Sequence, residues 1–311
     1  MVLTGQGRAE LRLRAEGDDM TQTAVDAPRT ALPTHRESQE AERVTYLLRQ
    51  RFRYTYDGPV RDLDHRLVVI PPRRHGDQRL LTHSVTVSAD GVRTARRRDA
   101  AGNSVIRCRV PLVPDQVEFV VEAAVERVGP GSHPLLPTDA LTDPRLLLPT
   151  PLTAADPAIQ ELARTMASQD PLATAERFCM YVHETISYAY GETSITTTAA
   201  QALAGGRGVC QDAAHVMIAL CRTAGLPTRY VSGHLLGEGG THAWVEVLVA
   251  DTDTDGARAV PFDPCNGRRC GIDYLTIATG RDYADVAPTS GTYLGSAQGT
   301  LTATKHVAVS H

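Results

Sequence analysis

The chain has 311 residues, a length that suits two domains or one large domain. Apolar residues make up 42% of the sequence and charged residues 22%, which predicts a packed core and excludes a disordered chain. The formal net charge of −4 argues against a protein that works mainly on nucleic acid. Of the 32 basic residues only Lys305 is a lysine, so we expect any amine that accepts an acyl group to come from another molecule.

The N-terminal region is polar. Its first residues lack the continuous apolar stretch of a signal peptide, and no window of the sequence reaches the ~18 apolar residues of a membrane span. We therefore expect a cytoplasmic protein with no membrane contact, whose six cysteines are mostly thiols. Residues 1–41 follow neither a helical nor a strand period, which predicts a disordered extension, and Met20 is a second candidate start.

Residues 42–127 carry the pattern of an all-β domain. Short runs rich in Val, Ile, Leu, Thr and Tyr alternate with turn signals such as Asp90-Gly91, and they predict strands at 46–56, 66–70, 80–87, 104–111 and 116–125. Strands at this spacing favour a sandwich-like domain. The run Arg96-Arg97-Arg98, with Arg93, lies beside a turn, and the negative net charge favours a solvated loop there over a nucleic-acid site.

Residues 128–156 are rich in proline and leucine and are predicted to be a connecting arm. The pattern then becomes helical: Asp156-Pro157 opens a helix to about 168, and Asp170-Pro171 opens a second one to about 186. Asp followed by Pro is typical of a helix start. A short helix at 196–200 and a glycine-rich turn precede a longer helix that begins at Cys210.

Three strand-like runs, 229–236, 241–249 and 258–263, follow that helix, and a glycine-rich connection makes the first two a hairpin. Strand character returns at 301–309. We therefore expect an α+β chain, with a second domain over 157–311 in which the helix of Cys210 packs on an antiparallel sheet.

Three side chains form a candidate catalytic set. Cys210 begins a helix, where the helix dipole and unpaired N–H groups favour the nucleophilic thiolate. Neighbouring antiparallel strands would place His242 beside Asp263, so that the carboxylate orients the imidazole and the imidazole takes the thiol proton. Each residue alone has an ordinary structural explanation, and the combination is what points to nucleophilic catalysis.

These residues lie in segments that resemble the transglutaminase-like superfamily: GVCQDAAH at 208–215, RTAGLPTRYVSG at 222–233, THAWVEV at 241–247 and FDP at 262–264. The tail at 280–288 and the stretch YTYDGPV at 54–60 resemble the bacterial branch, in which a β domain precedes the core. The resemblance implies a papain-like core with a Cys-His-Asp triad of Cys210, His242 and Asp263.

The implied chemistry is attack of a thiolate on the carbonyl of a peptide or protein amide, which gives a thioester acyl-enzyme. Water then makes the protein a peptidase or amidohydrolase, the outcome we favour. A small amine acceptor would make it an acyl transferase, and a non-catalytic scaffold is the third alternative. The backbone N–H of Cys210 is the natural oxyanion donor; Tyr190 and Gln201 are candidates for a second, and Trp244 either walls the site or packs in the core.

Two further patterns look like metal sites, but each has a simpler explanation. The run from Asp251 to Gly256 starts like a calcium-binding loop, but its twelfth position is Phe262, so an acidic hairpin tip is the simpler interpretation. Cys265 and Cys270 lack a second pair at zinc-ribbon spacing, and they are alternatively a reversible disulfide. We expect no metal and no cofactor.

Overall fold

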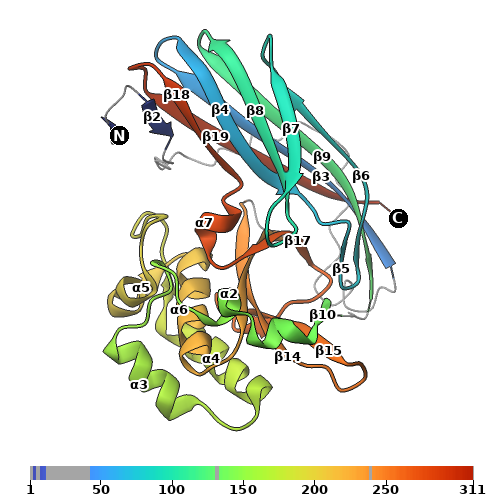
Figure 1. Cartoon of the computed structure of the whole chain (residues 1–311), viewed down its shortest axis with the longest axis vertical. Coiled ribbons are helices and arrows are strands. Elements are labelled where there is room, and N and C mark those ends of the chain that lie inside the picture. Colours follow the sequence, from blue (N-terminus) through green and yellow to red (C-terminus); the bar gives the residue numbers. More distant parts are fainter. Residues whose placement is uncertain (1–2, 5–7, 12–42, 130–132, 238–239, 311) are drawn as a thin grey trace.

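The computed structural model describes residues 3–4, 8–11, 43–129, 133–237 and 240–310, and it has two lobes (Figure 1). One lobe is a β-sandwich. Its first sheet has the order β1 (Leu3–Thr4), β2 (Arg8–Leu11), β18 (Thr289–Leu294), β4 (Val60–Ile70), β8 (Ser104–Val113), β7 (Arg93–Arg98). Its second sheet has the order β19 (Gly299–Ser310), β3 (Arg43–Tyr56), β9 (Gln116–Val128), β6 (Gln78–Val87), β5 (Arg74–His75).

Alternation along the strands builds the core of this lobe. Every second residue of β3 is buried, and side chains such as Tyr54, Leu67 and Phe119 meet between the sheets. The predicted sandwich-like domain is therefore confirmed, and the five predicted strands lie within β3, β4, β6, β8 and β9.

The boundary of this lobe differs from the one predicted. The sequence assigns 157–311 to the second domain, but β18 pairs with β4, and β19 pairs with β3 from Gly299↔Tyr56 to Ser310↔Thr45. The prediction failed because a strand pattern gives no information on which distant strand will be its partner. Of the predicted disordered extension 1–41, most lies outside the described residues, while the short strand β2 pairs with β18.

The arginine run is a strand and not the solvated loop that the sequence predicts. β7 forms the edge of the first sheet, pairs with β8, and has all six residues exposed. An edge strand that packs against nothing needs no apolar face, and its charges deter pairing with other chains. The hydrophobic period that reveals buried strands is therefore missing here.

The second lobe packs helices on an antiparallel sheet, as predicted. The sheet has the order β10 (Leu135–Pro137), β15 (Gly256–Asp263), β14 (His242–Ala250), β13 (Thr228–Leu235), β17 (Tyr274–Gly280). The helices are α2 (Pro144–Leu147), α3 (Pro157–Met166), α4 (Pro171–Thr185), α5 (Ala199–Gly205), α6 (Cys210–Thr223) and α7 (Tyr283–Val286), with a 3₁₀ turn η1 (Thr138–Thr142). Smaller strands are β11 (Ser187–Tyr188), β12 (Arg207–Gly208) and β16 (Arg268–Arg269).

Helix α6 is the centre of this lobe. Twelve of its residues, Gln211 to Arg222, are buried, because α3, α4 and α5 cover one side and β13 and β14 the other. Asp156 and Asp170 cap α3 and α4 through their side chains, as the sequence predicts. Among the described residues, no helix is long and apolar enough to cross a membrane.

Two buried amides of the sandwich attach it to strand β17. Gln78 donates from Nε2 to the oxygen of Thr276 and accepts from its nitrogen, both at 2.8 Å. Asn103 does the same with Thr279, at 2.8 and 2.9 Å. Each amide thus satisfies the backbone N–H and C=O of one residue on the outer edge of β17, groups that would otherwise be buried without partners. Because these hydrogen bonds require a fixed geometry, they define how the two lobes pack together.

A buried carboxylate, Glu246 on β14, adds a charged contact between the lobes. Its oxygens accept from Arg229 Nε and pair with His75 Nε2, each at 2.6 Å. Burial alone would raise the pKa of Glu246, but the charges and hydrogen bonds of Arg229 and His75 outweigh it and hold that pKa at about 2. The carboxylate is therefore ionised across the physiological range.

Replacing this residue, Glu246→Gln, is expected to lower the free energy of unfolding by about 3 kcal/mol, because it leaves Arg229 buried without its counter-charge. Because the folded pKa lies below the ordinary value of 4.5, the stabilisation is present above that pH and fades as the pH falls towards 2. Urea unfolding at neutral and acidic pH measures both effects. Glu122→Gln, which removes an exposed partner of Arg49, is the control and should cost under about 0.5 kcal/mol.

Candidate active site

Cys210 is the first residue of α6 and is half-buried. The turn before it is tight: a Cβ added at Gly208 would lie 2.6 Å from Asp212 Oδ2, so only glycine fits there. The space is needed because Asp212 folds back and accepts from Val209 N at 2.8 Å and from Thr193 Oγ1 at 2.7 Å. The N–H of Cys210 itself is one of the first-turn donors that have no partner within the helix.

His242 and Asp263 are in direct contact. His242 begins β14, Asp263 ends β15, and Nε2 of the ring lies 2.7 Å from Oδ2 of the carboxylate. Both side chains are almost completely buried, with 2% and 0% exposed. The prediction that adjacent strands would place these two residues side by side matches this geometry.

Asp263 has further donors that the sequence did not reveal. Its Oδ2 also accepts from Tyr274 Oη and Asn266 Nδ2, both at 2.7 Å, and its Oδ1 from the backbone of Cys265 at 2.9 Å. Burial would raise the pKa of Asp263, but the hydrogen bonds and charge of His242, with those of Asn266 and Tyr274, hold it below its usual value. An ionised Asp263 accepts the Nε2–H of His242, which makes Nδ1 the basic nitrogen of the neutral ring.

The topology brings Cys210 to the same end of the sheet as His242. A short turn joins α6 to β13, so the two run antiparallel, and their lengths of about 21 and 26 Å are similar. The start of α6 therefore lies near the end of β13, where the chain turns into β14 and reaches His242. Cys210 also packs against the apolar cluster that contains Ala243.

Trp244 packs against the ring of His242. It is 1% exposed, its ring stacks with that of His242 at 6.3 Å between centroids, and Tyr274 packs edge-on against it at 5.3 Å. A Cβ at Gly233 would overlap the indole, so glycine is required on the neighbouring strand. Of the two alternatives for Trp244, packing in the core describes its place.

Both parts of the chain match known protein families. Residues 160–264, which contain Cys210, His242 and Asp263, match the family described as the transglutaminase-like superfamily, and residues 46–126 match the bacterial transglutaminase-like N-terminal region. The chain therefore has a transglutaminase-like core preceded by a bacterial transglutaminase-like N-terminal region.

Two sequences and one solved structure, all from bacteria, are similar to this chain. The chain is 30% identical over 161 residues to an uncharacterized protein of Mycobacterium leprae, a match that covers 48% of this chain and 55% of that protein. It is 27% identical to an uncharacterized protein of Mycobacterium tuberculosis over 71% of this chain and 79% of that one. A crystal structure from Cytophaga hutchinsonii, named a "putative cysteine protease", has the same fold, with a TM-score of 0.70, 20% identity, and coverage of 87% of this chain and 92% of its own.

Tyr190 and Gln201, the two candidates for a second oxyanion donor in the transglutaminase-like core, lie in different surroundings. Tyr188 pairs with Gly208 in parallel, so Tyr190 follows that pair by two residues as Cys210 does, and its side chain is 67% exposed. Gln201 caps α5: its Oε1 accepts from Thr198 N at 3.0 Å. Tyr190 therefore follows a strand pair that ends two residues before α6, while the side-chain oxygen of Gln201 already has a structural partner. The oxyanion role of either stays a prediction.

The residues of the two metal-like patterns make the following contacts. Thr254 Oγ1 donates to Asp251 Oδ2 at 2.6 Å within the acidic hairpin tip. All six cysteines lie in the described part of the chain, and none of them forms a disulfide. Among the described residues, no group of three or more His, Cys, Asp or Glu side chains could hold a metal ion.

The single lysine lies next to this site. Lys305, on β19 of the sandwich, donates from Nζ to the oxygen of Gly240 at 2.6 Å. Gly240 lies two residues before His242, in the connection between β13 and β14. The sandwich thus contacts the backbone that leads into the strand of the histidine.

Replacing the acid of the first turn, Asp212→Ala, is expected to lower the free energy of unfolding by about 1–2 kcal/mol, the usual effect of losing a helix cap. Val209 N and Thr193 Oγ1 lose their acceptor. The loss of stability is reduced because the substitution also removes Oδ1, which is buried without a partner, and a carboxyl whose pKa burial raises. Thermal unfolding measures the effect. Glu192→Ala, which removes an exposed acid from the same loop as Thr193, should leave the midpoint almost unchanged.

Proposed function

We propose that the chain is a thiol-dependent hydrolase of peptide or isopeptide amide bonds, with Cys210 as nucleophile, His242 as base and Asp263 as the orienting acid. The observation that carries the proposal is the buried His242–Asp263 pair at the end of the sheet where α6 begins with Cys210. The name of the Cytophaga structure agrees with hydrolysis, and the likeness to it extends to the fold alone.

The reaction would proceed in two halves. His242 takes the proton of the Cys210 thiol, and the sulfur attacks the amide carbonyl to form a C–S bond. The backbone N–H of Cys210 stabilises the oxyanion. His242 then returns its proton to the departing amine as the C–N bond breaks, leaving a thioester. Water, deprotonated by His242, attacks the thioester and releases the carboxylic acid and the thiol.

Thiol reactivity tests the nucleophile. Burial raises the pKa of Cys108 to about 11, and that of Cys179 and Cys221 to about 12, so these thiols are protonated at neutral pH. Cys210 should therefore be alkylated by iodoacetamide much faster than the others, and His242→Ala should slow it. Mass spectrometry of the labelled peptides measures each rate. Similar rates for all six cysteines would contradict the proposal.

The acceptor is tested separately, because the same thioester can react with an amine. An amide substrate is offered with and without a primary amine, and the mass of the acyl product is recorded. Hydrolysis predicts the free acid in both mixtures. An amide of the added amine as the main product would make the protein an acyl transferase and would leave the role of Cys210 intact.

A further inference from the structure

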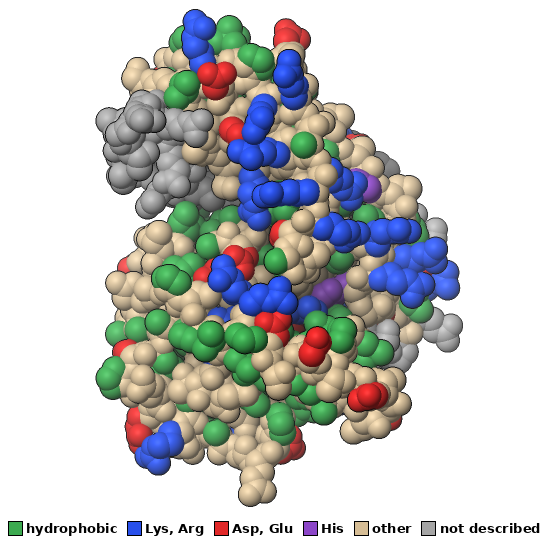
Figure 2. Space-filling view, viewed as in Figure 1, with side chains coloured by type: hydrophobic (Ala, Val, Ile, Leu, Met, Phe, Trp, Pro, Cys, Tyr) green, Lys and Arg blue, Asp and Glu red, His purple; other side chains and the backbone are tan. Residues whose placement is uncertain are grey.

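A long groove runs along the junction of the two lobes, on the face shown in Figure 2. It consists of two cavities of about 590 and 600 Å³, which share the lining residues Ala101, Leu136, Arg229 and Thr279 and so form one channel. We call this channel the junction groove. Its walls come from the β5–β6 turn and the β7–β8 turn of the sandwich, and from β10, β13 and β17 of the core.

The first half of the junction groove is strongly basic. Its lining includes four arginines and two histidines and no acidic residue: Arg73, Arg74, Arg98, Arg229, His75 and His133. In Figure 2 basic side chains gather along the junction around a patch of histidine. Glu246 lies behind this surface and pairs with Arg229 and His75, so the other three arginines of this half have no carboxylate from it. Within the described part of the chain, Arg73 and Arg74 form no ion pair and both are exposed.

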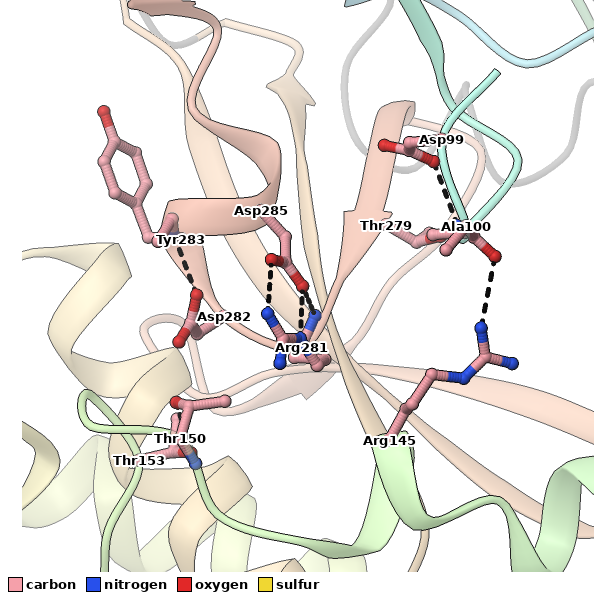
Figure 3. A network of polar contacts seen from close by, with 12 residues as sticks. Asp99, Ala100, Arg145, Thr150, Thr153, Thr279, Arg281, Asp282, Tyr283 and Asp285 are labelled. Atoms are coloured by element: carbon pink, nitrogen blue, oxygen red, sulfur yellow. Dashed lines mark hydrogen bonds and ion pairs between the residues drawn. The ribbon is translucent and has the colours of Figure 1, made fainter.

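The lining of the second half has a net charge closer to zero. This half is lined by three acids, Asp139, Asp143 and Asp285. Asp143 pairs with Arg145 at 2.6 Å, and Asp285 pairs with Arg281 at 2.8 Å, the second pair being visible in Figure 3. Arg145 also reaches across the junction to the oxygen of Ala100 at 3.4 Å. Unmatched positive charge is therefore concentrated at the Arg73–Arg74 end.

Strand β10 forms a side of both halves, and it is one of the two edge strands of the core sheet. Alternate residues of an antiparallel strand bond to the partner strand. Ala259 N donates to the oxygen of Pro134 at 2.9 Å, so the backbone groups of the next residue, Leu135, point away from β15. The side chain of Leu135 is 60% exposed, and an extended peptide could pair with this edge.

We propose that the junction groove binds an extended polypeptide segment rich in aspartate and glutamate. Its length and open strand edge suit a peptide backbone, its apolar wall of Pro72, Pro134 and Leu135 suits side chains, and its arginines suit carboxylates. Nucleic acid fits less well because the chain as a whole carries a net charge of −4. The inference concerns binding and does not depend on the proposed reaction.

The test is fluorescence anisotropy of labelled deca-glutamate with the full chain at low ionic strength. We expect saturable binding that the double variant Arg73→Gln, Arg74→Gln weakens by about tenfold. The matched control is Arg49→Gln, Arg51→Gln, which removes the same charge from exposed positions on β3 and should change the affinity less than about twofold. Both doubles change exposed residues, and thermal unfolding checks that they fold.

Other results would overturn the inference. These are no binding by the wild-type chain, equal weakening by the two doubles, or binding of a deoxythymidine decamer as tight as that of the peptide. The last would identify a phosphate site. Repeating the titration with Cys210→Ala separates binding from catalysis, because the affinity should be unchanged whether or not the chain hydrolyses amides.

Discussion

Cys210→Ala is expected to lower kcat for amide hydrolysis by about 10⁴-fold or more, because no other group at the start of α6 can form the thioester. Single-turnover assays measure the loss, and mass spectrometry should find an acyl group on the wild-type Cys210 and none on the variant. The fold should be unaffected, since the side chain is only half-buried and loses one sulfur atom.

The matched control for that change is Cys108→Ala, which removes a buried thiol from the core of the sandwich. It should cost about 1 kcal/mol of stability and leave kcat unchanged. If Cys210→Ala kept more than a tenth of the wild-type activity, the nucleophile would have to be sought elsewhere.

Asp263→Asn is expected to lower kcat by about 10³-fold to 10⁴-fold with a small change in KM. The amide keeps the shape and the oxygen that accepts from the backbone of Cys265, but it loses the charge that stabilises a protonated His242. The neutral amide also allows the ring its other tautomer, with the proton on Nδ1, where it no longer acts as a base.

The same substitution should change the pH dependence of the protein's stability. Because the folded pKa of Asp263 lies below its ordinary value of 3.8, its ionised form stabilises the wild type above that pH and the stabilisation is lost as the pH falls through the folded pKa. Asp263→Asn should lack this acid transition in thermal unfolding. Asp253→Asn, at the exposed hairpin tip, is the control for the loss of charge, and equal effects of the two would contradict the role of Asp263.

Much of this site could be predicted because its signals are local. Cys210 follows a glycine-rich turn. His242 begins β14 and Asp263 ends β15, and these two strands are neighbours in both the sequence and the sheet. Asn266 and Tyr274 were missed because their role depends on the irregular chain from Asp263 to β17. That strand has all seven residues buried, so no alternation marks it as a strand.

The larger errors in the predicted fold involve distant pairing. The strand at 301–309 was predicted, but its partner β3 lies about 250 residues away, and nothing in either segment encodes that match. The edge strand β7 was missed for the opposite reason, since it makes no core contact that a hydrophobic pattern could report.

The return of β18 and β19 to the sandwich has a consequence for biosynthesis. A ribosome completes the whole transglutaminase-like core before it adds the strands that finish the first lobe, so the first lobe cannot finish folding before the second has been synthesised. Until then the fourteen-residue strand β3 has an open edge, which is a template for aggregation. We expect the nascent chain to need chaperone protection during this interval, and residues 42–127 expressed alone to be insoluble.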